Sequence, residues 1–414
     1  MREKVLGEVH ARPFRPLTGP RTVLHYAFLT NTEEAAADQA WLSEFCVSRG
    51  APGPVAGTRH HTLSFGSGTL SWEQHAEFTT YTWDGAAARD RIFGQLSDTH
   101  PFGAAFRAPG DLLVAVRLEL REPLEESGWR DQFDESSLTV STLEDDAAIA
   151  ATDFRQDGDG LTRILVFNRS LSDVQAGAVV QRLLEIETYR TLAMLGLFEA
   201  GGLQPEIRRA EIELAELTGQ MKDASALGAN QELLDKFTEL AAGLEAGATA
   251  STFRFGASRA YDQIVKARFG TLKETAAPGE LSMSSFLGRR LAPAMRTCQA
   301  IEDRQAMLSR KLARATTLLR TRVDVELERQ NRSLLQSMNR RARLQLRLQQ
   351  TVEGLSVAAV SYYIVGLVSY LAKAAKEAGL PVPNANITTG LAVPLVVLLI
   401  WWTVRRIRKH HTGE

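Results

Sequence analysis

The stretch LQQTVEGLSVAAVSYYIVGLVSYLA, residues 348–372, joins a long polar helix to an apolar segment. Upstream of it, residues 294–353 contain neither Gly nor Pro, so we expect one uninterrupted helix there. At 1.5 Å per residue that helix would be a rod of about 90 Å. Residues 354–372 carry no charge and approach the length needed to cross the hydrocarbon core of a bilayer. The sequence therefore predicts a helix that begins in water and ends in a membrane.

A second uncharged apolar segment, residues 387–404, ends in Trp401 and Trp402, which suit the membrane interface. The short connection between the two segments would be a turn on the far side of the bilayer. Basic residues favour the cytoplasmic side, so we expect a two-pass hairpin over residues 354–404 with both termini in the cytoplasm. The alternative is a buried core hairpin of a soluble protein. The flanking basic residues are Arg332, Arg340, Arg341, Arg343 and Arg347 before the first segment, and Arg405, Arg406, Arg408 and Lys409 after the second.

Small side chains recur along one face of the first apolar segment. They occur at Gly354, Ala358, Ser361, Val365 and Ser369, at helical spacing. Small residues let helix backbones approach closely in lipid, so this face predicts a helix–helix contact. The contact is with the second segment of the same chain, or with another subunit around a central pore. A lipid-anchored monomer without such a contact is the third alternative.

The preceding residues 279–353 form the predicted stalk, which is basic and amphipathic. One helix cannot bury its own apolar stripe, so we expect coiled-coil packing against folded-back helices or neighbouring subunits. In a symmetric bundle, uncharged polar side chains on this helix could face the axis and meet hydrated ions. A solvated helix face explains them equally well. The candidates for lining a pore are Gln345, Gln349, Ser356, Ser361 and Ser369.

Charge is distributed unevenly along a chain whose net charge is -1. Residues 1–278 hold 27 Lys+Arg against 40 Asp+Glu, residues 279–353 hold 15 against 7, and residues 354–414 hold 6 against 2. A basic stalk and a basic cytoplasmic tail (405–414) suit an anionic membrane surface. The acidic head argues against a nucleic-acid partner.

The first half of the chain predicts an α+β head, with strands over residues 1–170 followed by helices. Expected strands are 21–30, 60–65, 69–83, 111–120, 138–141, 147–154 and 161–168, with a helix over 32–48. Residues 171–278 are predicted to be helical, with one helix ending near Glu199 and an acidic helical hairpin over about 204–248. The hairpin carries a net negative charge and the stalk a net positive charge. The acidic residues could therefore pair with the basic stalk, or they could form a low-affinity site for a divalent cation.

Few residues of the head suggest chemistry. His60, His61 and His75 lie on neighbouring predicted strands and are weak candidates for a transition-metal site. His10 and Arg12 belong to an extended arm that could contribute to a ligand site. The sequence Asp-Gly-Asp-Gly at 157–160 lacks the later bidentate Glu of a calcium loop and predicts a hairpin turn.

Sequence motifs for catalysis are missing, because the chain has no Walker loop, dinucleotide fingerprint or Gly-x-Ser-x-Gly elbow. We therefore expect no enzymatic activity and no cofactor, although a pocket in the head could still carry an unrecognised reaction. The two cysteines, Cys46 and Cys298, show no pairing pattern and suit a reducing compartment. The N-terminus lacks the apolar region of a signal peptide.

Four segments resemble an uncharacterised family of bacterial membrane-anchored proteins of the DUF3422 type. These segments are EVHARPFRPL, WEQHAEFTTYT, LLEIETYRTLAMLGL and LQQTVEGLSVAAVSYYIVGLVSYL. The likeness covers nearly the whole chain and implies a location in the bacterial inner membrane. It implies no activity and no functional residues.

The layout also resembles the CorA-type divalent-cation channels, which are homopentamers with a cytoplasmic head, a long stalk helix and a two-helix membrane hairpin. The Gly-Met-Asn signature of those channels is replaced here by Tyr370-Leu371-Ala372-Lys373. From this resemblance we expect a homo-oligomer in the lipid bilayer with a cytoplasmic sensing head, moving or sensing an ion or small solute such as a divalent cation. The alternative is a membrane-tethered scaffold or sensor whose hairpin acts only as an anchor.

Overall fold

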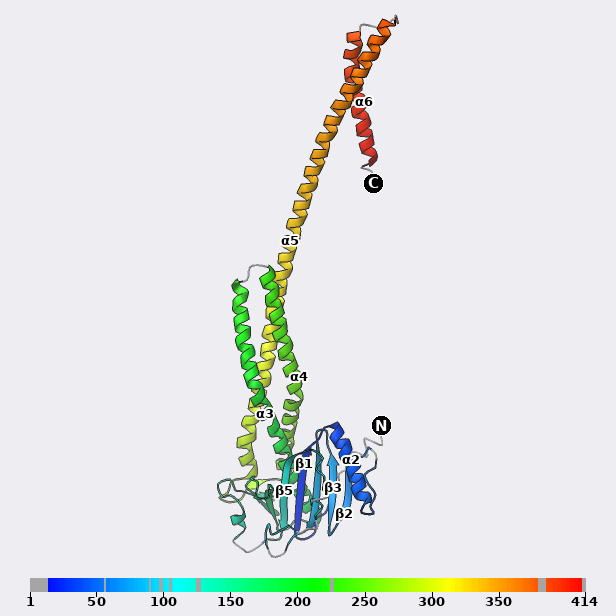
Figure 1. Ribbon diagram of the computed structural model, residues 1–414. Coiled ribbons are helices and arrows are strands. Elements are labelled where there is room, and N and C mark those ends of the chain that lie inside the picture. The colour runs from blue at the N-terminus through cyan, green and yellow to red at the C-terminus, as the bar shows by residue number, and fades with distance from the viewer. Residues whose placement is uncertain are drawn as a thin grey trace. The chain divides into compact units, whose positions relative to one another are not determined.

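Alternating side chains in the first half of the chain build a nine-stranded mixed sheet (Figure 1). The strand order is β2-β3-β4-β1-β5-β8-β7-β6-β9, and every pair is antiparallel except β5 with β8. The computed structural model describes residues 14–55, 57–88, 91–96, 100–103, 106–123, 128–223, 227–378 and 385–411. The strands are β1 (Arg21–Leu29), β2 (His60–Phe65), β3 (Gly68–Gln74), β4 (Phe78–Ala86), β5 (Asp111–Arg121), β6 (Thr139–Leu143), β7 (Ala148–Thr152), β8 (Thr162–Asn168) and β9 (Thr275–Ala276).

One face of the sheet packs against helix α2 (Thr32–Val47). The helix begins at a capping box, in which the Asn31 side chain accepts from the backbone of Glu34 and the Glu34 carboxylate accepts from the Asn31 N–H. Asp38 of α2 is buried and accepts hydrogen bonds from Trp72 Nε1 (2.7 Å) and Tyr81 OH (2.6 Å) on the sheet. These two bonds attach α2 to β3 and β4.

The opposite face packs against α3 (Asp173–Asp223), which continues into the bundle of α4 (Leu227–Thr271) and the first part of α5 (Met283–Glu377). A short 3-10 helix (Trp129–Gln132) precedes β6. Branched aliphatic side chains of β5 and β8 meet the first turns of α3 in one apolar cluster. Its fully buried members include Val116, Leu118, Val166, Val179 and Leu183. The α+β organisation expected for the head is therefore confirmed.

Three local expectations were wrong. Residues 69–83 form two strands rather than one, because the chain turns at residues 75–77, where the His75 N–H donates to the Phe78 carbonyl at 2.8 Å. The first long helix does not end near Glu199 but runs through Gly201, Gly202 and Pro205 to the end of α3. The segment after that proline buries an apolar stripe (Ile207, Ala210, Leu214 and Leu217), and this burial offsets the cost of roughly 1 kcal/mol per helical glycine and about 3 kcal/mol for the proline. Strand β9 interrupts residues 171–278, which we expected to be helical.

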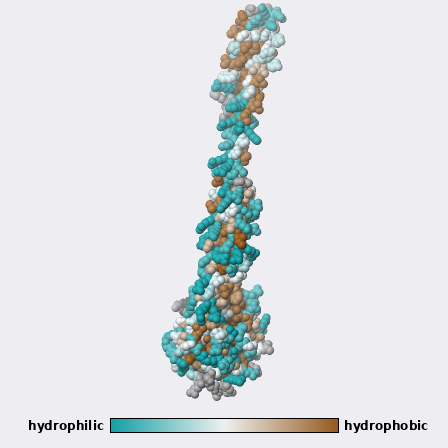
Figure 2. Space-filling view, turned by 90° about the vertical axis from the view of Figure 1, so that its left-hand side faces the viewer, coloured by the Kyte–Doolittle hydropathy of each residue, from teal (hydrophilic) through white to brown (hydrophobic). Residues whose placement is uncertain are grey.

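The chain divides into two compact units, Met1–Asp223 with Leu233–Thr317, and Ala224–Glu232 with Leu318–Glu414. In the second unit, α6 (Ala385–His411) runs alongside the end of α5 (Figure 1). Among the described residues from 354 onward, Ser361, Ala372 and Ile400 are buried, whereas most of the large apolar side chains are exposed. Figure 2 shows these apolar residues as brown patches. The helix assignment continues without a break through residues 349–356, as the sequence predicts.

Candidate functional site

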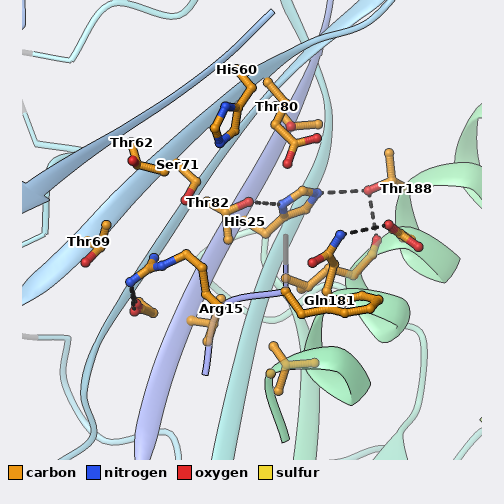
Figure 3. A pocket seen from close by; sticks show the side chains of 18 of the residues that line it. Arg15, His25, His60, Thr62, Thr69, Ser71, Thr80, Thr82, Gln181 and Thr188 are labelled. Atoms are coloured by element: carbon orange, nitrogen blue, oxygen red, sulfur yellow. Dashed lines mark hydrogen bonds and ion pairs between the residues drawn. The ribbon is translucent and has the colours of Figure 1, made fainter. Parts of the chain in front are cut away.

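A cavity of about 680 Å³ lies between the sheet and α3, within the first unit (Figure 3). Strands β1 to β4 form one wall and the first five turns of α3 form the other. The helix covers the apolar centre of this sheet face, but toward β2 the strands carry polar side chains at alternate positions. Those positions are His60 and Thr62 on β2, Thr69, Ser71 and Glu73 on β3, Thr80, Thr82 and Asp84 on β4, and His25 on β1.

The register of the strands arranges these side chains in rows across the sheet. His25 pairs with Thr82, Thr82 with Ser71, and Ser71 with Thr62, which forms one row of three hydroxyls and an imidazole. The neighbouring row on β2 to β4 contains His60, Glu73 and Thr80. Cross-strand neighbours in such a row have Cβ atoms about 4.5–5.5 Å apart, so one small molecule can touch several of them.

His25 is buried and links the two walls of the cavity. Its Nδ1 lies 2.7 Å from Thr82 Oγ1, and its Nε2 lies 2.9 Å from Thr188 Oγ1 on α3. The Thr188 hydroxyl donates its proton to the Leu184 carbonyl, so it accepts from His25 Nε2–H. The Thr82 hydroxyl then donates to Nδ1. Burial lowers the pKa of His25 to about 4, which keeps the ring neutral at pH 7.

Both arginines of the cavity lining are paired with carboxylates. Arg15 lies 3.2 Å from Asp84, and Arg268 of α4 binds Glu185 of α3. Burial raises the pKa of Asp84, and the nearby Arg15 opposes that shift. These pairs place both guanidinium groups of the lining against carboxylates, and Glu73 adds a third carboxylate to the lining.

Four hydroxyls of the sheet wall are available to a ligand. Thr62, Thr69, Ser71 and Thr80 make no side-chain hydrogen bond to any residue that the structure describes. Each hydroxyl can donate one hydrogen bond and accept two. The opposite wall combines the apolar surface of Val180, Leu184 and Tyr189 with three polar residues of α3 that already hydrogen-bond to protein groups, Gln181, Glu185 and Thr188. The arrangement can bind a small polar molecule with one hydrogen-bonding face and one apolar face.

The three candidate metal-binding histidines are separated by the sheet. His60 and His75 line the cavity together with Glu73, and His75 Nε2 lies 3.7 Å from Glu73 Oε2. His61 pairs with Trp72 on the face that packs against α2, because successive side chains of a strand point to opposite faces. In the described parts of the chain, no group of three or more His, Cys, Asp or Glu side chains is placed to hold a metal ion.

The remaining sequence candidates occupy different surroundings. Gln345, Gln349 and Ser356 are exposed on α5, Ser369 is half-buried, and Ser361 is buried. His10, Arg12 and the turn residues 379–384 lie outside the described residues. The predicted turn at 157–160 is present, with Asp157 Oδ1 accepting from the backbone of residues 159 and 161.

The acidic hairpin is partly neutralised by the stalk. Glu211 of α3 accepts two hydrogen bonds from Arg304 of α5, from Nε at 3.1 Å and from Nη2 at 2.7 Å. Arg304 lowers the pKa of Glu211, first through these hydrogen bonds and also through its charge. This contact is the charge complementarity that the sequence suggested as one alternative.

Sequence reasoning missed His25, Thr82 and Thr188, which form the centre of the site. A signal was present, because TLSWE (69–73) and FTTYTWD (78–84) place hydroxyls at alternate positions where a buried strand would carry apolar residues. The same pattern is typical of a solvated strand face. Only the position of α3 turns that face into a cavity wall.

Comparison with known proteins identifies a family and no further relatives. No curated protein and no solved structure matches the chain. A family model described as "Protein of unknown function (DUF3422)" matches residues 1–411, from before β1 to the end of α6. The match thus covers the head and both apolar helices, and the chain belongs to the DUF3422 family of proteins of unknown function.

Proposed function

We propose that the protein is a membrane-anchored sensor of a small polar molecule in the bacterial inner membrane. The two apolar helices span the bilayer with both termini in the cytoplasm, and the head binds the ligand in its cavity. The observation that carries the proposal is that one chain joins a polar cavity of about 680 Å³ to two helices long and apolar enough to cross a membrane.

Exposure of apolar side chains supports a lipid environment for the second unit. Tyr362 and Tyr370 are 78% and 75% exposed, and Leu355 is 73% exposed. Contiguous apolar surface of this kind is unfavourable in water by roughly 25 cal/mol per Å². The alternative of a buried core hairpin would cover these side chains, and almost none of the two apolar windows is buried.

The aromatic and basic residues at the end of α6 support the orientation. The Arg405 guanidinium lies 4.8 Å from the Trp401 ring centroid, and that of Arg406 lies 5.2 Å from the Trp402 ring. Tryptophans with adjacent arginines are typical of the cytoplasmic membrane interface. The basic stretch of α5 before residue 354 would then lie on the same side.

Cysteine labelling tests the anchoring and the topology. Cys46 and Cys298 are buried, and burial raises the pKa of both thiols, so the native protein should react slowly with maleimides. We expect Glu377→Cys, exposed beside the far turn, to be labelled by an impermeant maleimide in spheroplasts. Gln330→Cys, exposed on α5, should react only after permeabilisation. Labelling of both variants in intact spheroplasts, or release of the protein by alkaline carbonate, would contradict the proposal.

A second candidate function is an oligomeric channel or transporter with a CorA-like layout. The supporting observation is a series of exposed apolar side chains on α5 before the membrane segment: Leu327, Leu334, Leu335, Met338, Leu344, Leu348 and Val352. Neighbouring subunits could cover this surface and place Gln345, Gln349, Ser356 or Ser369 near an axis. Ser361 fits this role less well, because it is already buried within the single chain.

Exchange of the membrane hairpin separates the two candidates. A sensor should still bind its ligand and remain in the membrane when residues 354–404 are replaced by an unrelated two-helix anchor. A channel would lose ion flux in liposomes after the same exchange. A monomeric mass in both mild detergent and nanodiscs would exclude the oligomeric channel.

A further inference from the structure

We infer that the head cavity binds a neutral polyhydroxylated molecule, such as a sugar or a polyol. This inference rests on the ligand-binding role proposed for the cavity and specifies the chemistry of the ligand. Three properties of the described lining carry it: both of its arginines are paired with carboxylates, one wall presents available hydroxyls, and the other wall contributes the apolar surface of Val180, Leu184 and Tyr189.

The charge distribution disfavours an anionic ligand. A bound phosphate or carboxylate requires arginine or lysine side chains that are free to donate to it. Both arginines of the lining already bind carboxylates, Arg15 with Asp84 and Arg268 with Glu185. Gln181 Nε2 also donates to Glu185 at 3.2 Å. His25 lies between the walls as a neutral ring and adds no positive charge.

The hydroxyl wall matches a ligand with several hydroxyls of its own. Ser71 lies at the centre of the wall, directly opposite Thr62 on one neighbouring strand and Thr82 on the other. Thr69 lies two residues from Ser71 on the same face of β3, about 6–7 Å away along the strand. Neighbouring strands are about 4.8 Å apart. A ring that carries hydroxyls on successive carbons can reach several of these groups at once.

The direction of the His25 hydrogen bonds determines whether the Thr82 hydroxyl donates or accepts toward a ligand. Because the Thr82 hydroxyl donates its proton to His25 Nδ1, its oxygen remains only as an acceptor toward the cavity. A ligand hydroxyl can donate to that oxygen. Thr80 and Ser71 can reverse their roles and accept or donate. This combination selects ligands that present both donors and acceptors, and it leaves unsatisfied groups if an apolar molecule enters.

The helix wall suits the carbon skeleton of such a ligand. Val180 and Leu184 contribute aliphatic surface, and Tyr189 contributes an aromatic ring near Phe78, with the two ring centroids 6.1 Å apart. The C–H faces of a sugar ring pack favourably on surfaces of this kind. The cavity volume lies in the range of about 300–1,000 Å³ that is usual for small-molecule sites.

Saturation-transfer NMR on the full chain in nanodiscs tests the inference. The probes are D-glucose, myo-inositol and trehalose as neutral polyols, with inorganic phosphate and glycine as charged comparators. We expect at least one polyol to bind. Ser71→Ala should weaken its binding roughly 2- to 10-fold, and Ser71→Ala with Thr80→Val should weaken it further.

The matched control is Ser333→Ala, an exposed serine of α5 that does not line the cavity. It should leave binding unchanged, and equal thermal unfolding temperatures of the variants would establish that they fold. Polyols that fail to bind, or that bind wild type and the double variant equally, would overturn the inference. Binding of phosphate or glycine that the double variant abolishes would also overturn it, while the sensor proposal would stand.

Discussion

Three charged residues at alternate positions of β5 give the sharpest stability prediction. Arg117, Glu119 and Arg121 are all buried, with Glu119 only 1% exposed. One Glu119 oxygen accepts from Arg117 Nη2 at 2.7 Å, and the other accepts from Arg121 Nε at 3.0 Å and Nη2 at 2.6 Å. A single carboxylate therefore balances two buried guanidinium groups. We predict that Glu119→Gln strongly destabilises the head.

The magnitude follows from the loss of a buried charge partner. Glutamine retains one acceptor oxygen, but its amide group would face a guanidinium donor and its charge is zero. Removing one partner of a buried ion pair costs about 3–5 kcal/mol. Amide exchange of β5 depends on opening of the sheet, and each 1.4 kcal/mol is a factor of ten in an equilibrium. Exchange should therefore accelerate by roughly 10²- to 4 × 10³-fold in peptides that contain β5.

Hydrogen–deuterium exchange with mass spectrometry on the full chain measures this effect. The control is Glu122→Gln, an exposed carboxylate just beyond the end of β5, which should change exchange by less than about 3-fold. The reasoning would be refuted by equal exchange in the two variants. That result would mean that the carbonyls of Gly94 and Ala88, which also accept from these arginines, are sufficient to stabilise both charges.

Three further predictions concern other buried polar groups. Burial lowers the pKa of His25 to about 4, so between about pH 4 and 6.5 the unfolded chain binds a proton at His25 that the folded chain does not. The free energy of unfolding of the head should therefore rise with pH across that window. Urea unfolding at several pH values should show this pH dependence in the wild type and its loss in His25→Gln. Asp38→Ala leaves the buried donors of Trp72 and Tyr81 without an acceptor and should lower the free energy of unfolding by about 2–5 kcal/mol. Asp38→Asn retains one acceptor oxygen and should lower it less. Equal urea midpoints for the two variants would contradict this prediction. Ser361 is 4% exposed, so Ser361→Leu should destabilise the apolar helix pair by about 1–3 kcal/mol while Ser361→Ala should not, which protease sensitivity in nanodiscs can test.

Much of the head was predictable where local chemistry and tertiary packing favour the same structure. The helix after Asn31 begins with a capping box that is visible in the sequence, and Asp157 forms the expected turn. The apolar segments were predictable from composition alone, because a long uncharged run has few other stable environments. The continuity of α5 followed from the missing Gly and Pro over residues 294–353.

The failures occurred where distant residues decide the local structure. Residues 75–77 contain neither Gly nor Pro, so nothing in the sequence marks the hairpin between β3 and β4. The Arg254 and Tyr261 side chains of α4 bind Glu77 and thereby help to place that hairpin. The cavity was unpredictable for the same reason, since His25 resembles an ordinary strand histidine until Thr188 of α3 is placed beside it.

The late position of β9 in the chain sets the order in which the protein can be made. This edge strand follows α4, so the sheet is incomplete until residue 276 has been synthesised. Roughly 75 residues then separate it from the first apolar segment, which is a delay of roughly 4–15 s at ribosomal rates of about 5–20 residues per second. The first apolar segment would therefore leave the ribosome only after all strands of the head have been synthesised. In the proposed topology, insertion would occur late in translation and would not require export of the folded head.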